Sequence, residues 1–245
     1  MIRDEDIQKI KSILFKSANI CVFTGAGISC PSGIPDFRSA EGLYNRESGM
    51  KTPPEVILSR SFFNNRPAEF FEFYRQAMVY PDAKPNRAHL FFAGLEKKGK
   101  RAPVVTQNID GLHQAAGSSD VIELHGSVHR NFCAVCGAFY DLSAVLSAAG
   151  MPRCGRDNGI IKPDVVLYEE PLDEGVTGRA VSAVAGADTL FVVGTSLVVS
   201  PANTLLRYFR GANLIIVNKT PTHYDDMADI VVYDDIIRVV EHLEA

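Results

Sequence analysis

The segment Asn19-Ile20-Cys21-Val22-Phe23-Thr24-Gly25-Ala26-Gly27-Ile28-Ser29 joins an apolar run to a glycine pair. The apolar run favours a buried β-strand, and the two glycines predict a tight turn at its carboxyl end. Glycines one residue apart let the backbone approach a pyrophosphate, and the start of a following helix would supply N–H donors. Cys30 stands where the dehydrogenase pattern has its third glycine. The segment therefore predicts a dinucleotide site, but not a plain dehydrogenase.

Further apolar runs predict five more strands, and predicted helices separate most of them. The spacing of apolar residues indicates an amphipathic helix over 4–17, and another helix is expected over 86–98. The five runs cover residues 102–107, 121–124, 189–194, 213–218 and 230–232. Alternating strands and helices are typical of a parallel sheet with helices on its faces. The predicted fold class is therefore α/β.

Two segments interrupt this alternation. Residues 36–85 are rich in proline and include an aromatic helix between Pro67 and Pro81, whereas residues 129–162 carry three of the five cysteines. We expect these segments to form an inserted small domain, with a helical module and a zinc-knuckle-like module. The large domain would then consist of the remaining parts of the chain, which are residues 1–35, 86–128 and 163–245.

Length and charge exclude several classes of protein. The 245 residues suffice for one large domain with a smaller insertion. A net charge of −4 gives no general basic surface, so we expect no specific nucleic-acid partner. The apolar run over 190–199 is too short to span a membrane, and the acidic first residues do not resemble a signal peptide. We therefore expect a cytoplasmic protein without a membrane partner, whose cysteines are thiols or metal ligands.

Polar side chains follow the predicted strands at their carboxyl ends, where open α/β sheets bind ligands. Gln107, Asn108 and Asp110 follow one strand, and their amides and carboxylate could hold sugar hydroxyls or a carboxamide. Alternatively, Asp110 caps a helix. His125 follows the next strand and could take up a proton near neutral pH. We expect the other histidines to be structural or exposed, namely His89, His113, His129, His223 and His242.

The cysteines form an incomplete pair of metal-binding knuckles. Cys133-Ala134-Val135-Cys136 is followed by Cys154-Gly155-Arg156-Asp157, so Asp157 occupies the place of a fourth cysteine. Two such knuckles hold a structural zinc ion when all four ligands are present, and a carboxylate is a less usual fourth ligand. Both a zinc site at Cys133, Cys136, Cys154 and Asp157 and a knuckle without metal remain open.

Taken together, the motifs resemble those of the sirtuins, a family of NAD-dependent protein deacylases. The resemblance covers essentially the whole chain and rests on Gly25-Ala26-Gly27-Ile28-Ser29, Ser32 to Arg38, Thr106 to His113, Leu124-His125-Gly126, the cysteine knuckle and Gly194-Thr195-Ser196-Leu197. It implies a Rossmann-like large domain and a small domain, with NAD and an acyl-lysine protein or peptide in the cleft between them. It also implies transfer of the acyl group, which releases nicotinamide and O-acyl-ADP-ribose.

The resemblance further implies roles for single residues. His125 would be the general base, with Asn108 and Asp110 as the other catalytic residues. The residues expected to bind NAD are Gly25, Ala26, Gly27, Cys30, Asp36, Phe37, Arg38, Gln107, Asn108, Ile109, Asp110, His125, Gly194, Thr195, Ser196, Asn218, Lys219 and Asp235. The peptide would lie as an added strand against Val165, Val166, Leu167 and Tyr168 on one side and Leu197 and Val198 on the other.

Besides Asp157, the chain departs from the family pattern at two positions. Glu169 stands where the family has glycine and places a negative charge near the expected peptide. Ala77 stands three residues after Tyr74, where members that prefer succinyl or malonyl lysine have arginine, so we expect neutral acyl groups, acetyl first. Two alternative functions remain open, a protein ADP-ribosyltransferase on the same scaffold and a non-catalytic NAD or ADP-ribose sensor.

Overall fold

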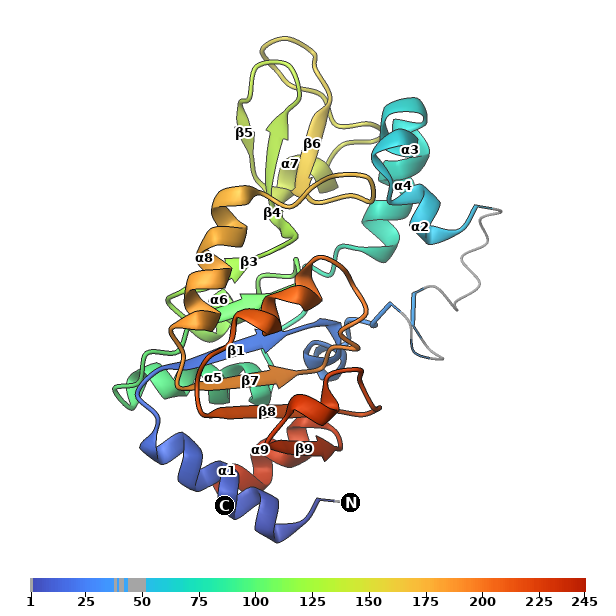
Figure 1. Ribbon diagram of the computed structural model, residues 1–245. Helices are drawn as coiled ribbons and strands as arrows, with labels where there is room; N and C mark the ends of the chain where they lie inside the picture. Colours follow the sequence, from blue (N-terminus) through green and yellow to red (C-terminus); the bar gives the residue numbers. More distant parts are fainter. Residues whose placement is uncertain (1, 38, 40–41, 44–51) are drawn as a thin grey trace.

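The computed structural model (Figure 1) describes residues 2–37, 39, 42–43 and 52–245. In these residues, six parallel strands form a sheet in the order β3-β2-β1-β7-β8-β9. The strands are β1 (Ile20–Thr24), β2 (Val104–Thr106), β3 (Val121–Glu123), β7 (Thr189–Val193), β8 (Asn213–Asn218) and β9 (Ile230–Tyr233). All six strands expected from the sequence are present. The direction of winding reverses between β1 and β7, which is where a Rossmann-like sheet opens a crevice for a ligand.

Helices cover both faces of this sheet (Figure 1). One face packs against α1 (Asp4–Lys16), α5 (Arg87–Lys97) and α9 (Ile236–Glu244), and the other against α8 (Glu174–Ala185) and the 3₁₀ helix η3 (Ala202–Tyr208). All of β1 is buried because its alternate residues face two different cores. This explains why the strand reads as a continuous apolar run.

The helix expected after the glycine pair does not form as an α-helix. Two 3₁₀ turns stand there instead, η1 (Ala26–Ile28) and η2 (Cys30–Ser32). Pro31 lacks a backbone N–H, and Gly33 adopts a left-handed φ of 87°, so an α-helix cannot continue through this segment. Short elements also follow β2 and β8, namely α6 (Leu112–Ala116) and η4 (Asp225–Met227).

A smaller group of elements stands beyond the β3 edge of the large sheet (Figure 1). Its antiparallel sheet has the order β5-β4-β6, with β4 (Gly126–Cys133), β5 (Phe139–Tyr140) and β6 (Ile161–Val165), and α7 (Leu142–Leu146) packs beside it. The helices are α2 (Pro54–Ile57), α3 (Arg60–Asn65) and α4 (Pro67–Ala77). Aromatic side chains of α3 and α4 share one apolar core with Cys133, Cys154 and residues of β4 and β6.

The two long strands of the small sheet lead directly to the large sheet. β4 begins immediately after His125, and Gly126 pairs with Val165 at the end of β6. The sequence-based boundaries at 128/129 and 162/163 fall within these strands. None of the helices in the described residues has the length and apolar character needed to cross a membrane.

Candidate active site

A cavity of about 720 Å³ lies at the carboxyl ends of the large sheet and extends to α4 and β6. Most of the predicted NAD and peptide residues line it: Gly25, Ala26, Gly27, Cys30, Asp36, Phe37, Gln107, Asn108, Ile109, Asp110, His125, Val165, Val166, Leu167, Tyr168, Gly194, Thr195, Ser196, Asn218 and Lys219. Asp235, Leu197 and Val198 are not part of the lining. Arg38 lies outside the described residues.

The glycine loops after β1 and β7 touch each other at the reversal of strand order. The N–H of Gly27 donates to the carbonyl oxygen of Gly194 at 2.8 Å. A Cβ atom on Gly27 would stand 2.8 Å from the Gly194 Cα, and a Cβ on Gly194 would stand 2.4 Å from the Ile28 nitrogen. Gly194 also has a left-handed φ of 59°. Contact between two loops of the protein therefore requires glycine at both positions, before any ligand is considered.

Asp110 and Asn108 are held in a partly buried polar cluster with the first glycine loop. The Ser29 hydroxyl donates to Asp110 Oδ2 at 2.7 Å, and the Leu112 N–H donates to Oδ1 at 2.9 Å. Asn108 Nδ2 donates to the Gly25 carbonyl and to Ser29 Oγ, both at 3.1 Å. Burial raises the pKa of Asp110. Asp110 therefore bonds to the start of α6 and lines the cavity as well.

Ser29 is a site residue that the sequence-based selection omitted. Its side chain joins Asn108 to Asp110, and the residue lines the cavity. Its position in the Thr24–Ser29 turn was the only feature of the sequence that pointed to it. A serine in that turn does not indicate a hydrogen bond to a carboxylate 81 residues further along the chain. His129 also reaches the cluster, because its Nε2 lies 3.1 Å from the Asp110 carbonyl oxygen.

His125 is oriented by a backbone carbonyl. Its Nδ1 lies 2.9 Å from the Gln107 carbonyl oxygen, and a carbonyl can only accept, so Nδ1 carries the hydrogen. Nε2 is consequently the proton-accepting nitrogen. Burial lowers the pKa of His125, which keeps the ring neutral near pH 7. The Gln107 side chain in turn donates to Thr195 Oγ1 at 3.1 Å, across the reversal point.

Lys219 lines the cavity, and Asp235 lies behind it, outside the lining. Lys219 Nζ is 2.8 Å from Asp235 Oδ2, and this contact raises the pKa of the lysine. Asp235 also accepts from the Ile237 N–H at the start of α9. Cys30 bonds weakly to the Ala26 carbonyl, and burial raises the pKa of its thiol. Cys30 is therefore a neutral thiol rather than a reactive thiolate.

The segment after β6 connects the histidine to the helices of the small group. The Val166 N–H donates to the His125 carbonyl, and the Tyr168 N–H donates to the Leu58 carbonyl, both at 3.0 Å. Glu169 has a left-handed φ of 74°, which explains why glycine suits this position. Its carboxylate accepts from the Ser61 N–H at 2.9 Å and from the Ser61 hydroxyl at 2.6 Å.

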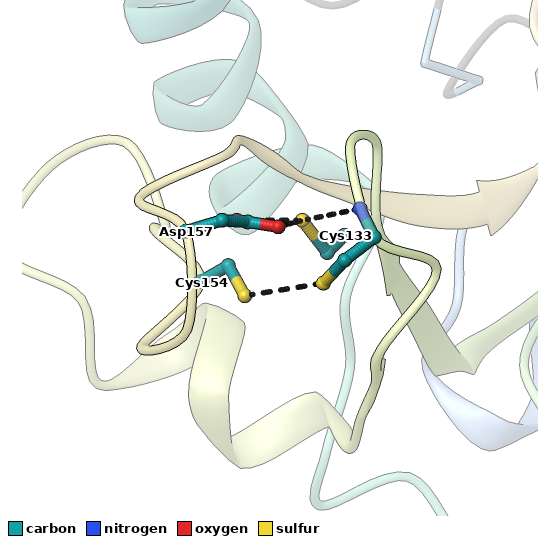
Figure 2. Close-up of side chains that lie close together, drawn as sticks. Cys133, Cys154 and Asp157 are labelled. Carbon is teal, nitrogen blue, oxygen red and sulfur yellow. Dashed lines mark hydrogen bonds between the residues drawn. The ribbon is translucent and has the colours of Figure 1, made fainter.

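Cys133, Cys136, Cys154 and Asp157 come together in the small sheet, with all four ligand atoms within 4.8 Å of one another. Figure 2 shows Asp157 pointing toward Cys133. The sulfurs of Cys136 and Cys154 lie 3.7 Å apart. Ligands of a tetrahedral zinc ion with Zn–S bonds of 2.3 Å stand about 3.8 Å apart. Backbone N–H groups also point at the sulfurs of Cys133 and Cys154. The donor set therefore fits a zinc ion.

A family model, similar sequences and a similar solved structure all point to the same family. The model of the Sir2 family matches residues 25–201. The chain is similar to a protein of Clostridium acetobutylicum named NAD-dependent protein deacetylase, with 52% identity covering 98% of this chain and 99% of the relative. A protein of the same name from Clostridium perfringens is 53% identical, covering 97% and 98%. A solved Sir2 structure with a deacetylated p53 peptide and 3'-O-acetyl ADP ribose is 36% identical, with a TM-score of 0.87 and coverage of 97% and 96%.

Proposed function

The chain belongs to the Sir2 family and is an NAD-dependent protein deacetylase, and we propose that His125, Asn108 and Asp110 carry its reaction. The observation that carries this proposal is the convergence of the three side chains on one cavity at the reversal of strand order. The cavity volume is in the range of small-molecule sites, and the glycine loops leave backbone open to it.

NAD, when bound, supplies a ribose carbon that accepts the acyl group as nicotinamide leaves. Asn108, held by Gly25 and Ser29, orients a ribose hydroxyl. Asp110 receives the carboxamide of nicotinamide together with Ile109. His125 takes the proton of a ribose hydroxyl at Nε2, and its neutral state near pH 7 suits that task. Gln107 also holds the ribose, and Phe37 covers the nicotinamide ribose. The glycine loop after β1 approaches the phosphates, and Thr195, Ser196, Asn218, Lys219 and Asp235 surround the adenosine.

The substrate that we propose is a protein or peptide with a neutral acyl-lysine, acetyl first. The segment Val165–Tyr168 would pair with the peptide on one side and Leu197 and Val198 on the other. The uncharged residues Tyr74, Ala77 and Met78 line the end of the cavity at α4, which suits a short uncharged acyl group. All five cysteines are outside disulfide bonds, in keeping with the reducing, cytoplasmic setting that we propose.

We further propose that Cys133, Cys136, Cys154 and Asp157 bind zinc in a structural role. Cys133 and Cys154 belong to the core that also contains the aromatic residues of α3 and α4. A metal ion bound there would therefore stabilise the helix α4 that lines the cavity without contacting the substrate.

We also propose that residues 36–85 and 129–162 form the small domain and that the other three segments form the large domain. The substrate would lie between the two domains.

The fate of labelled NAD separates this function from its alternatives. The protein is incubated with NAD labelled in the adenosine half and with an acetyl-lysine peptide. Deacetylation places the label in a small acyl-ADP-ribose molecule and removes the acetyl group from the peptide. Label fixed covalently to protein would establish ADP-ribosyl transfer instead. Binding of NAD without any release of nicotinamide would establish a sensor.

A further inference from the structure

Two histidines that the proposed reaction does not use lie next to each other where α5 meets α6. His89 on α5 is 0% exposed and His113 on α6 is 1% exposed, and their ring centroids are 4.8 Å apart. Burial lowers the pKa of His89 to about 4 and that of His113 to about 3. Both rings are therefore neutral at physiological pH, and each has one nitrogen with a hydrogen and one without.

Hydrogen bonds from known donors fix the form of each ring. The hydroxyl of Thr24 donates to Thr106 Oγ1 at 2.8 Å, so its single hydrogen is in use. His113 Nε2, 3.0 Å from Thr24 Oγ1, must then be the donor of that contact, which leaves Nδ1 as an acceptor. The backbone N–H of Asn86 donates to His89 Nδ1 at 3.3 Å, so Nε2 of His89 carries the hydrogen.

The two remaining ring nitrogens are complementary. His89 Nε2 is a donor and His113 Nδ1 is an acceptor, and both are buried without a hydrogen-bond partner among the described residues. Leaving a buried donor and a buried acceptor unpaired is costly. Because the two ring centroids are only 4.8 Å apart, each ring offers the partner that the other ring's nitrogen lacks.

We propose that His89 Nε2 donates to His113 Nδ1, completing a buried hydrogen-bond chain that positions Asn108 in the active site. The chain runs from Asn86 through both rings to Thr24 and Thr106, and Thr106 Oγ1 accepts from the backbone N–H of Asn108 at 3.1 Å.

The opposite end of the chain holds the other cofactor loop. Asn86 Nδ2 donates to the Ile28 carbonyl at 2.8 Å and to Ser32 Oγ at 2.9 Å. The chain thus links the loop after β1 to the turn after β2, and His89 and His113 are positioning residues. The functional half of this inference rests on the proposed role of Asn108, whereas the hydrogen bond between the rings does not.

Nuclear magnetic resonance of the full chain with ¹⁵N-labelled histidine tests the bond directly. The expected result is a through-bond coupling between His89 Nε2 and His113 Nδ1, with neither ring titrating around pH 6.5, the ordinary histidine value. A hydrogen on Nδ1 of His89, or titration of either ring near that value, would overturn the proposal. This result does not depend on any enzymatic activity.

Variants test the positioning role. His113→Phe keeps a ring but removes both nitrogens, and we expect kcat to fall about 10-fold or more, since displacement of reacting groups by 1 Å can cost 100-fold. KM for NAD should rise by a smaller factor. His113→Gln carries both a donor and an acceptor and should recover most of the lost kcat. The exposed His223→Phe is the matched control, with unchanged kcat.

A folded His113→Phe protein with wild-type kcat would contradict the positioning role. If this variant does not fold, His89→Phe removes the donor at the other end of the proposed bond together with the acceptor of the Asn86 N–H, and it is judged by the same kcat criterion. Absence of deacetylation in the wild-type protein would instead refute the proposed function and leave the spectroscopic result standing.

Discussion

The polar contacts of the cavity join residues far apart in the chain, whereas those of the cysteine knuckle lie within two neighbouring turns. Ser29 bonds to Asp110 across 81 residues, and Gln107 bonds to Thr195 across 88. The knuckle ligands lie between Cys133 and Asp157, and two local turns bring their ligand atoms within 4.8 Å of one another. The cavity therefore depends on the whole large sheet, while the knuckle can exchange one ligand and still keep a metal-binding donor set.

The largest effect should come from removing the proposed base of the cavity. His125→Ala takes away the proton acceptor, and we expect deacetylation to slow by about 100- to 10,000-fold, the usual contribution of general-base catalysis. NAD binding, measured by calorimetry, should persist because the glycine loops are unchanged. Wild-type turnover in the variant would disprove the assigned mechanism, and the exposed His223→Ala serves as the control.

Removal of metal should act on stability rather than on the chemistry of the cavity. A protein purified with one zinc ion per chain should lose about 4 kcal/mol of unfolding free energy on chelation, if free zinc had been a thousand times its Kd. Asp157→Cys should hold zinc more tightly than the wild type, and Asp157→Ala less tightly. Elemental analysis measures the zinc content, and thermal melting measures the loss of stability. A protein without zinc whose melting temperature does not change when a chelator is added would rule the site out.

Contact between the two glycine loops can be broken with one methyl group. Gly194→Ala forces a left-handed residue and a clash with the Ile28 nitrogen, and we expect a loss of about 2–4 kcal/mol in urea unfolding. Gly178→Ala lies within α8 with open space around it, and should stabilise the protein by up to about 1 kcal/mol. Equal effects of the two changes would show that the loop contact has no special importance.

The pH dependence of kcat/KM reports on the burial of His125. Because burial lowers its pKa, the neutral base survives to lower pH than an exposed histidine, and activity falls only as pH drops through that lowered value. The acid midpoint of kcat/KM should therefore lie below about 6.5. A midpoint at or above this value would contradict the assignment of His125 as a buried neutral base.

The smallest effect concerns the rim of the cavity. Glu169→Gln keeps an oxygen that can accept from Ser61 but removes the negative charge. We expect kcat/KM to fall about 2-fold for a peptide with arginine beside the acetyl-lysine, as is usual for an exposed charge pair. An alanine-containing peptide should be processed equally by both proteins. Identical arginine preference in wild type and variant would show that Glu169 does not contact the peptide electrostatically.

The sequence was most informative where a residue's environment is set locally. The five residues of β1 read as a buried strand because both faces of the strand meet apolar cores. Strand-end positions then placed Asn108, Asp110 and His125 at one edge of the sheet, as parallel strands require. The cysteine knuckle was likewise visible from its spacing alone.

Features that depend on distant contacts were not predictable from the sequence. The role of Ser29 appears only when the loops after β1 and β2 meet, and the contact of Gly27 with Gly194 only when β1 and β7 pair. Two 3₁₀ turns near Pro31 stand where the sequence predicted a helix, although the proline already disfavours a continuous α-helix there. The left-handed φ of Glu169 explains why the family has glycine at this position, but the sequence alone does not show that the backbone turns there.

The most direct test of the account measures nicotinamide and O-acetyl-ADP-ribose in the same reaction, with and without an acetyl-lysine peptide. If the cavity performs peptide-dependent deacetylation, the two products appear in equal amounts and only when the peptide is present. Nicotinamide release without peptide, or in excess over O-acetyl-ADP-ribose, would contradict the account.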